Sequence, residues 1–233
     1  MNIVITGASK GIGKAIAEKF AALGNTLLLC SRNEKNLQEV ADEIAAKNKS
    51  VDIKIKAADL SDKAQAIAFA EWCLLSGTPS ILVNNAGFYM PGNVMDEPDG
   101  TLELQINTNL YSAYHITRKL LPEMIVKKSG HIFNICSIAS LHAYAGGGGY
   151  SISKYAMHGF SQNLRNELKP HGIKVTAVFP GAVMTDSWGN FDNSNGRIME
   201  TMDVANMIYA ASQLSPQAVV EDIVMRPQLG DLN

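Results

Sequence analysis

The stretch Thr6-Gly7-Ala8-Ser9-Lys10-Gly11-Ile12-Gly13 decides the fold, because it joins the apolar run at residues 2–6 directly to an amphipathic segment. Its three glycines let the backbone approach a bound group closely, and a helix start offers free N–H groups and the positive end of the helix dipole. Both features suit a phosphate. The stretch therefore predicts a strand, a phosphate-binding turn and a helix. A tight turn without a ligand is the alternative.

Short β-branched runs alternate with longer helical patterns along the rest of the chain. Several runs are continuously apolar, which is typical of strands covered on both faces in a parallel sheet. This alternation predicts an α/β, Rossmann-type doubly wound fold with a seven-stranded parallel sheet and helices on both faces. The expected strands are residues 2–6, 26–30, 51–57, 81–83, 131–136, 174–179 and 219–225, and the expected helices are residues 12–23, 34–47, 61–75, 102–126, 150–169 and 201–214.

Length and composition narrow the classes of protein. The chain has 233 residues, 46% of them hydrophobic, and a net charge of −2, which favours one domain over residues 1–233. The chain has no long run of like charges, so no nucleic-acid partner is expected. It also has no apolar segment of the kind found in membrane spans or secretory leaders, so neither is expected. Three separated cysteines in apolar runs indicate reduced thiols and a cytoplasmic protein. The histidines lack metal-ligand spacing, so no metal is expected.

Three loops are expected to follow strands at residues 88–100, 138–149 and 182–197, where open α/β sheets bind ligands. The segment at about residues 182–200 is the expected substrate loop, either a lid anchored by Trp188 and Phe191 or a plain surface loop. Four consecutive glycines, Gly146 to Gly149, are interpreted as a flexible connector, with a roomy, mobile pocket as the alternative.

An ordered set of motifs accompanies the glycine turn. Asn84-Asn-Ala-Gly87 ends the fourth expected strand, Asn109 lies in the long expected helix, Ser137 precedes Tyr150-Ser-Ile-Ser-Lys154 by 13 residues, and Pro180-Gly181 follows the sixth strand. Tyrosine and lysine at i and i+4 share one helix face. Together with the glycine turn, this set resembles the short-chain dehydrogenase/reductase family along almost the whole chain.

The resemblance implies a catalytic tetrad of Asn109, Ser137, Tyr150 and Lys154, with Asn107 as a competitor for the asparagine role. Tyr150 would act as general acid/base and Ser137 would bond the substrate oxygen. Lys154 would hold the nicotinamide ribose, and Asn109 would anchor a water. A positive charge about 4 Å from a phenol, at a dielectric of about 20, stabilises the phenolate by roughly 4 kcal/mol. Lys154 is therefore expected to lower the pKa of Tyr150 toward neutrality.

The expected cofactor is NADP(H). The second expected strand ends in Ser31 and Arg32 without an acidic residue, and Arg32 and Lys10 would meet a 2′-phosphate. Asp59 is alternatively a turn or N-cap residue, and Asn84 is interpreted as a structural residue that joins strands. The full expected cofactor set is Gly7, Ser9, Lys10, Gly11, Ile12, Gly13, Ser31, Arg32, Asp59, Leu60, Asn85, Ala86, Gly87, Tyr150, Lys154, Pro180, Gly181, Val183 and Thr185.

These residues together predict an NADP(H)-dependent oxidoreductase that interconverts a small-molecule carbonyl and an alcohol. A non-catalytic NADP-binding regulator of the same fold is the alternative, and a different Rossmann-type enzyme, such as a methyltransferase, fits less well. The ending Arg226-Pro-Gln, in place of the family's common Asp-Gly-Gly, resembles that of a subset of the family. By resemblance, a homotetramer is expected, with a dimer left open.

Overall fold

Seven parallel strands form one sheet in the order β3-β2-β1-β4-β5-β6-β7 in the computed structural model, which describes residues 1–232. The predicted fold class is confirmed. Each strand agrees with an apolar run of the sequence to within a few residues. The strands are β1 (Asn2–Thr6), β2 (Thr26–Ser31), β3 (Asp52–Ala57), β4 (Ile81–Asn84), β5 (Gly130–Ile135), β6 (Ile173–Pro180) and β7 (Asp222–Met225).

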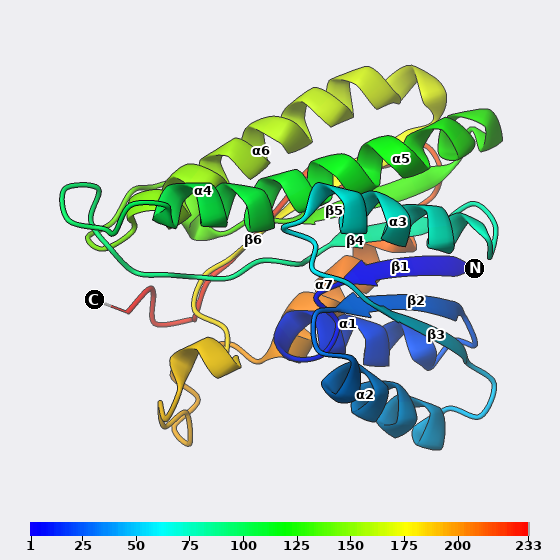
Figure 1. Cartoon of the computed structure of the whole chain (residues 1–233). Coiled ribbons are helices and arrows are strands. Elements are labelled where there is room, and N and C mark those ends of the chain that lie inside the picture. The colour runs from blue at the N-terminus through cyan, green and yellow to red at the C-terminus, as the bar shows by residue number, and fades with distance from the viewer. Residues whose placement is uncertain (233) are drawn as a thin grey trace.

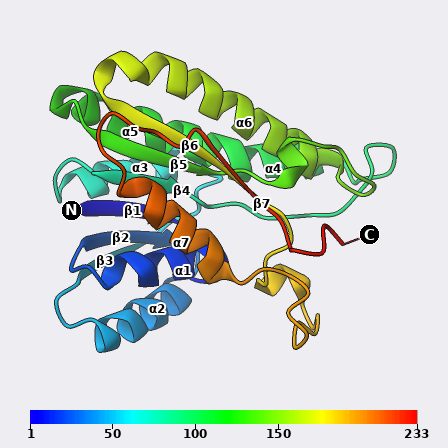
Figure 2. The ribbon, with the colours of Figure 1, turned by 180° about the vertical axis from the view of Figure 1, so that it is seen from behind.

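Helices cover both faces of the sheet (Figures 1 and 2). One face carries α1 (Gly11–Ala21), α2 (Glu34–Lys47) and α7 (Thr201–Ser212). The other carries α3 (Lys63–Leu74), α4 (Thr101–Ile106), α5 (Ser112–Lys127) and α6 (Gly148–Leu168). The two larger apolar clusters of the core lie around Ile5 and Phe20 and around Leu28 and Phe69, and a smaller one lies around Phe179. The central strands are therefore buried on both sides, which explains why their sequences lack polar alternation.

Two elements differ from their predicted forms. The expected single helix at residues 102–126 is interrupted by a π-helical segment, η1 (Asn107–Tyr111), whose wider turn places Asn109 toward the protein interior. The expected strand at residues 219–225 begins only at Asp222. At Val220 the carbonyl oxygen accepts a hydrogen bond from the Thr176 hydroxyl, a side-chain contact in place of a strand ladder.

The sheet reverses its chain order at β1, which pairs with both β2 and β4. Ligands of open α/β sheets bind outside the carboxyl ends of the strands at such a switch point. The loops that follow β4, β5 and β6 all leave from this edge (Figure 1). The three cysteines are buried and free, as expected. Among residues 1–232, no helix combines the length and the apolar composition that a membrane crossing requires.

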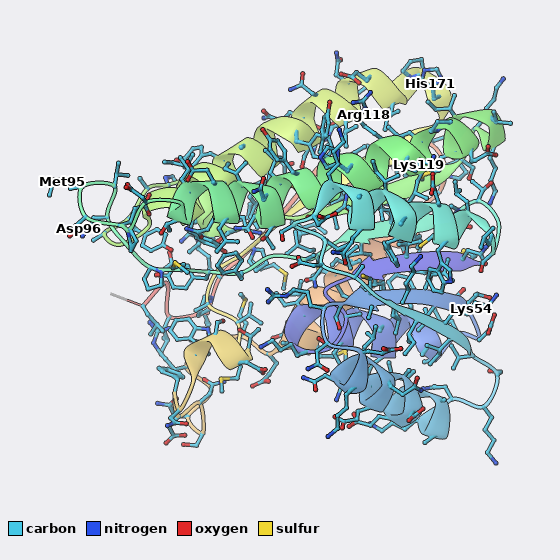
Figure 3. The ribbon with its side chains drawn as sticks, in the orientation of Figure 1. Lys54, Met95, Asp96, Arg118, Lys119 and His171 are labelled. Atoms are coloured by element: carbon cyan, nitrogen blue, oxygen red, sulfur yellow. The ribbon has the colours of Figure 1, made fainter. Side chains whose placement is uncertain are left out.

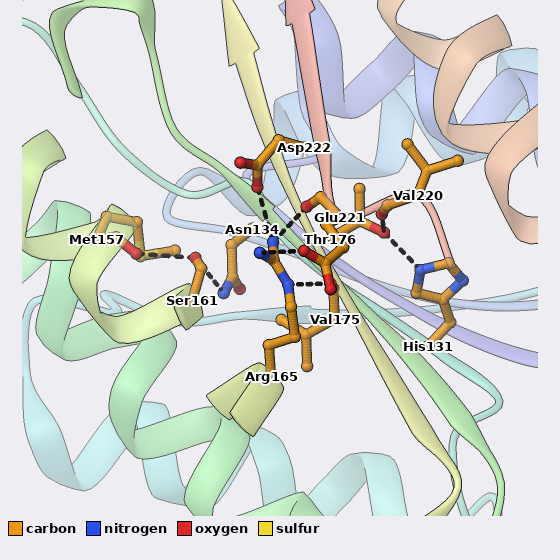
Figure 4. Close-up of polar contacts among 10 residues, drawn as sticks. All are labelled: His131, Asn134, Met157, Ser161, Arg165, Val175, Thr176, Val220, Glu221 and Asp222. Atoms are coloured by element: carbon orange, nitrogen blue, oxygen red, sulfur yellow. Dashed lines mark hydrogen bonds and ion pairs between the residues drawn. The ribbon is translucent and has the colours of Figure 1, made fainter. Parts of the chain in front are cut away.

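A buried polar network joins β5, β6 and β7 away from this edge (Figure 4). His131 Nε2 lies 2.7 Å from Thr176 Oγ1, and that hydroxyl donates its hydrogen to the Val220 carbonyl. The ring nitrogen must therefore donate, so the His131 ring carries its proton on Nε2. Burial, with a smaller contribution from the charge of Lys174, lowers the pKa of His131 to about 3.

We expect His131 to make the protein less stable as the pH falls. The folded protein keeps the ring neutral, whereas the unfolded chain binds a proton below its ordinary pKa of 6.5, so this stability is present above pH 6.5 and is lost toward pH 3. Between about pH 7 and about pH 5 the loss is about 2 kcal/mol. Denaturant unfolding of wild type and His131→Gln at both pH values measures it. If the free energies of unfolding of the two proteins differed by the same amount at both pH values, this account would be contradicted.

Candidate active site

The glycine turn after β1 leaves no room for side chains. Gly7 and Gly11 have φ of +66° and +55°, which favour glycine, and a Cβ at Gly13 would lie 2.2 Å from the Gly7 carbonyl oxygen. The Asn85 side chain fastens the turn by donating hydrogen bonds to the carbonyl oxygens of Thr6 and Gly7 at 2.9 and 3.1 Å. The turn is thus a closely packed cradle of backbone N–H groups at the start of α1.

Thr6 is a site residue that the sequence prediction missed. Its hydroxyl oxygen accepts hydrogen bonds from the backbone N–H groups of Asn85 and Ala86, both at 2.9 Å, and so ties the end of β4 to the end of β1. Its position immediately before the first glycine of the turn is the sequence feature that could have indicated this role. Asn84 joins neighbouring elements, as expected, because its amide donates to Thr117 Oγ1 and Asn134 Oδ1.

The end of β2 presents a positive charge. Arg32 is exposed there, whereas Ser31 is buried and its hydroxyl donates to the Asn33 carbonyl at 3.1 Å. Asp59 Oδ1 accepts hydrogen bonds from the N–H and hydroxyl of Ser61, so its alternative role in a turn is the one observed. These bonds, with a smaller contribution from Arg32, lower the pKa of Asp59. Leu60 is buried in the apolar core, so its side chain faces away from solvent.

Tyr150 and Lys154 lie on α6 and face Ser137 at the end of β5. Ser137 caps a short 3₁₀ helix, η2 (Ile138–Ser140), and its Oγ accepts the Ala139 N–H at 3.1 Å. Lys154 is buried, donates from Nζ to the Ile135 carbonyl at 2.8 Å, and lies 5.8 Å from the centre of the Tyr150 ring. The predicted serine, tyrosine and lysine are therefore brought together.

The expected lowering of the Tyr150 pKa is wrong for this structure. Burial raises the pKa of Tyr150, and a hydrogen bond with Ser137 opposes that rise. Burial also lowers the pKa of Lys154 to about 8, against a smaller opposing effect of Cys136. Near pH 7 the site therefore holds a protonated phenol beside a mostly protonated amine, a pair suited to donating a proton.

Asn109 is buried and its side chain is fully engaged. Oδ1 accepts the Phe88 N–H at 2.9 Å, and Nδ2 donates to the Phe88 carbonyl and to Ser153 Oγ. Ser153 in turn donates to the Tyr150 carbonyl at 2.7 Å, a link that the sequence prediction missed. Asn107 lines a separate surface depression with Lys63 and Tyr114. The structure thus places Asn109, and not Asn107, beside the tyrosine-bearing helix.

The segment after β6 closes the other side of the edge. The Gly181 N–H donates to the Met225 carbonyl at 2.7 Å, and Val183 is buried and bridged to Met199. Thr185 lies against Gly11, where an added Cβ would be 3.3 Å from the threonine methyl carbon. Pro180, the last residue of β6, leads into this segment.

An ion pair joins this segment to the glycine turn. Lys10 Nζ lies 3.1 Å from Asp186 Oδ2, and both side chains are largely exposed. The neighbouring rings of Trp188 and Phe191 pack against each other with centroids 5.4 Å apart. The structure thus seats the start of the expected substrate loop beside the turn, and Asp186 is a contact of Lys10 that sequence reasoning missed.

The run of four glycines before Tyr150 contacts the loop after β4. Gly146 is hydrogen-bonded to Gly92 and Asn93, Gly148 and Gly149 lie close to Glu97, and these last two glycines already belong to α6. The flexible connector stays a prediction, but the loop after β4 contacts three of the four glycines, and its backbone occupies the space of a side chain at Gly148. Within residues 1–232, no three histidine, cysteine or acidic side chains gather as metal ligands would.

Comparisons with known proteins identify the family of the chain. A family model described as short chain dehydrogenase matches residues 1–196. The sepiapterin reductase of Chlorobaculum tepidum is 33% identical, with 99% of this chain and 97% of that protein aligned. A metagenomic short-chain oxidoreductase in complex with NADP is 32% identical, with a TM-score of 0.85 and 98% and 97% of the two chains covered. A serine dehydrogenase complexed with NADP+ is 28% identical, with a TM-score of 0.86 and 100% and 97% coverage. The chain belongs to the short-chain dehydrogenase family.

Proposed function

We propose that this protein is an NADP(H)-dependent oxidoreductase that interconverts a carbonyl and an alcohol, with Tyr150 as the general acid/base. The observation that carries the proposal is the grouping of Ser137, Tyr150 and Lys154 at the sheet edge where the glycine turn opens. A phenol beside a buried ammonium group is a means of moving a proton at neutral pH.

The residues at the edge fit a dinucleotide. The glycine turn has no room for a Cβ at Gly7 or Gly13, which would clash with Asn85 or with the turn itself. A glycine turn at a helix start offers its backbone N–H groups to a phosphate. Gly87 lies close to Lys154, where an added Cβ would be 3.7 Å from Nζ, and Thr185 lies against Gly11 of the glycine turn. The nicotinamide group, when bound, supplies or accepts the hydride. The chain's own residues then hold the cofactor, orient the substrate and handle the proton.

Proton transfer in the reduction direction follows from the pKa values. Tyr150 holds its phenolic proton firmly at neutral pH, so it donates only to a strongly basic oxygen such as the alkoxide that forms as a carbonyl is reduced. The Ser137 hydroxyl, beside the phenol, hydrogen-bonds the same substrate oxygen. Lys154 stabilises the phenolate that remains, as its charge persists until its pKa of about 8. The Ile135 carbonyl fixes the position of this lysine.

The preference for NADP(H) over NAD(H) rests on the end of β2. Arg32 is exposed there, and residues 31–33 at the end of the strand include no acidic side chain, which would favour the 2′-hydroxyl of NAD. The related structures in complex with NADP and NADP+ support the same preference. Lys10 adds a second cation whose present partner is Asp186. Cytoplasmic location and a homo-oligomeric state stay predictions from the sequence.

A panel of ketones, aldehydes and 3-oxoacyl thioesters, each mixed with protein and NADPH, tests the proposal. We expect NADPH oxidation with at least one class of carbonyl, faster than with NADH. Tight NADPH binding without oxidation by any of them would favour the alternative, a non-catalytic regulator. The intact serine, tyrosine and lysine speak against that alternative, because a regulator does not need a proton donor.

A further inference from the structure

Residues 92–97, in the loop after β4, are hydrogen-bonded to the run of four glycines that precedes Tyr150. The Gly92 N–H donates to the Gly146 carbonyl, and the Gly146 N–H donates to Asn93 Oδ1, both at 3.0 Å. The Gly149 N–H donates to Glu97 Oε2, also at 3.0 Å. We call residues 92–97 together with Gly146 to Gly149 the glycine clamp. It joins two loops that are about 50 residues apart in the sequence.

The clamp explains why glycines occupy these positions. A Cβ at Gly148 would lie 2.4 Å from the Gly92 carbonyl oxygen and 2.7 Å from Glu97 Oε2. A Cβ at Gly149 would lie 3.2 Å from Gln105 Nε2 and from the Leu102 Cα, and 3.3 Å from Glu97 Oε1. Side chains at these positions would push the loop and Glu97 away. The loop therefore packs closely against Gly148 and Gly149, the two glycines that begin α6.

The first turn of α6 depends on this contact. Its N-cap residue, Gly147, has no side chain with which to cap a free N–H group, and the next two residues are glycines, which are poor helix formers. Tyr150 follows directly in this weak first turn. The Glu97 carboxylate satisfies one free N–H and places a negative charge at the positive end of the helix dipole. Glu97 therefore supplies from another loop the cap that the helix itself lacks.

We propose that Glu97 is a positioning residue, whose carboxylate holds the first turn of α6 so that Tyr150 stays aligned with Ser137 and Lys154. The inference rests on the proposed function for its kinetic consequence, but the anchoring of the helix does not need turnover. Met95 and Asp96 point outward at the tip of the same loop (Figure 3). Met95 is 93% exposed. Glu97, next along the chain, is partly buried and bonds to Gly149.

Replacing Glu97 with alanine tests the proposal. We expect Glu97→Ala to lower kcat by about tenfold to a hundredfold, because a displacement of about 1 Å at a reacting group has effects of that size. The dissociation constant of NADPH should stay within about twofold, since the glycine turn after β1 is untouched. Glu97→Gln keeps an acceptor oxygen for the Gly149 N–H and should recover most of the loss. The measurements are steady-state kinetics and NADPH titration.

Asp99→Ala is the matched control, because Asp99 lies in the same loop, is exposed and carries the same charge. Its kcat should match that of wild type. An equal loss in Asp99→Ala and Glu97→Ala would overturn the proposal, as would an unchanged kcat in Glu97→Ala. If Glu97→Ala does not fold, Glu97→Asp keeps the charge and shortens the side chain. A native melting temperature with reduced kcat in that variant supports the proposal, and a native kcat overturns it.

Amide hydrogen exchange separates this inference from the proposed function. In Glu97→Ala we expect faster exchange at residues 149–152, with no change in the later turns of α6 and recovery in Glu97→Gln. If none of the carbonyls tested supports NADPH oxidation by the wild-type protein, the proposed function fails. The exchange result still decides whether Glu97 holds the start of α6. Unchanged exchange at these amides would overturn the anchoring itself.

Discussion

Tyr150→Phe is expected to lower kcat by about 10²- to 10⁴-fold, the range typical of a lost general acid. The change keeps the ring, which packs edge-to-face against Tyr89 with centroids 4.9 Å apart, and removes only the hydroxyl. Binding of NADPH should persist, because the glycine turn and Lys154 are unaltered. Steady-state rates of NADPH oxidation and a fluorescence titration of NADPH give the two values.

Tyr155→Phe is a suitable control for this prediction. Tyr155 lies five residues later on the same helix and is 45% exposed, so its hydroxyl does not reach the site. Its kcat should equal that of wild type. A Tyr150→Phe protein that binds NADPH and turns over at the wild-type rate would remove Tyr150 from the mechanism.

Arg32→Asp is expected to weaken NADPH binding by about tenfold to a hundredfold and to leave NADH binding unchanged or stronger. A charge-assisted hydrogen bond contributes about 1.5–3 kcal/mol, and the introduced carboxylate would repel the 2′-phosphate. Arg32 is exposed at the end of β2, so the substitution disturbs no packing in the core. Calorimetric titration with both nucleotides measures the change.

Lys35→Asp provides the matched control, since Lys35 lies three residues further on, in the first turn of α2, and is also exposed. It changes the net charge by the same amount away from the strand end. The ratio of the NADPH and NADH dissociation constants should stay at its wild-type value in this variant. A ratio unchanged in Arg32→Asp would mean that another group selects the cofactor.

Much of the fold could be predicted from the sequence, because the spacing of apolar residues along a helix or strand reflects which side chains are buried. Continuous apolar runs such as Leu27 to Leu29 predicted strands that lie between two helical layers, and those residues are indeed buried. The π-helical segment at Asn107–Tyr111 could not be predicted, because its helical period is nearly that of the flanking helices. Asn109, inside this segment, is hydrogen-bonded to Phe88, a contact that the sequence pattern does not reveal.

The candidate site divides in the same way. Ser137, Tyr150 and Lys154 follow from short spacings within β5, its loop and α6, so sequence alone placed them together. Thr6 and Glu97 act on partners 79 and 52 residues away, and no local pattern marks such contacts. The run of four glycines shows most clearly what the sequence alone could not predict. Four glycines suggest freedom in sequence, whereas the neighbouring loop contacts three of them.

The pKa of Tyr150 could not be obtained from spacing either. The prediction placed the Lys154 charge about 4 Å from the phenol and counted its attraction alone. In the structure the ammonium group is bonded to the Ile135 carbonyl and lies 5.8 Å from the ring centre, while burial disfavours the phenolate. Burial therefore outweighs the hydrogen bond with Ser137, so the pKa of Tyr150 rises and the phenol keeps its proton near pH 7.

Transfer of deuterium from the nicotinamide ring to a product carbon tests the central claim most directly. The protein is incubated with NADPH in which both hydrogens of the reactive ring carbon are replaced by deuterium and with a carbonyl that it reduces, and the alcohol is examined by mass spectrometry. We predict one deuterium in each alcohol molecule, on the carbon that was the carbonyl, and one NADPH consumed for each alcohol formed. Alcohol without deuterium, or NADPH binding without any alcohol, would contradict the account.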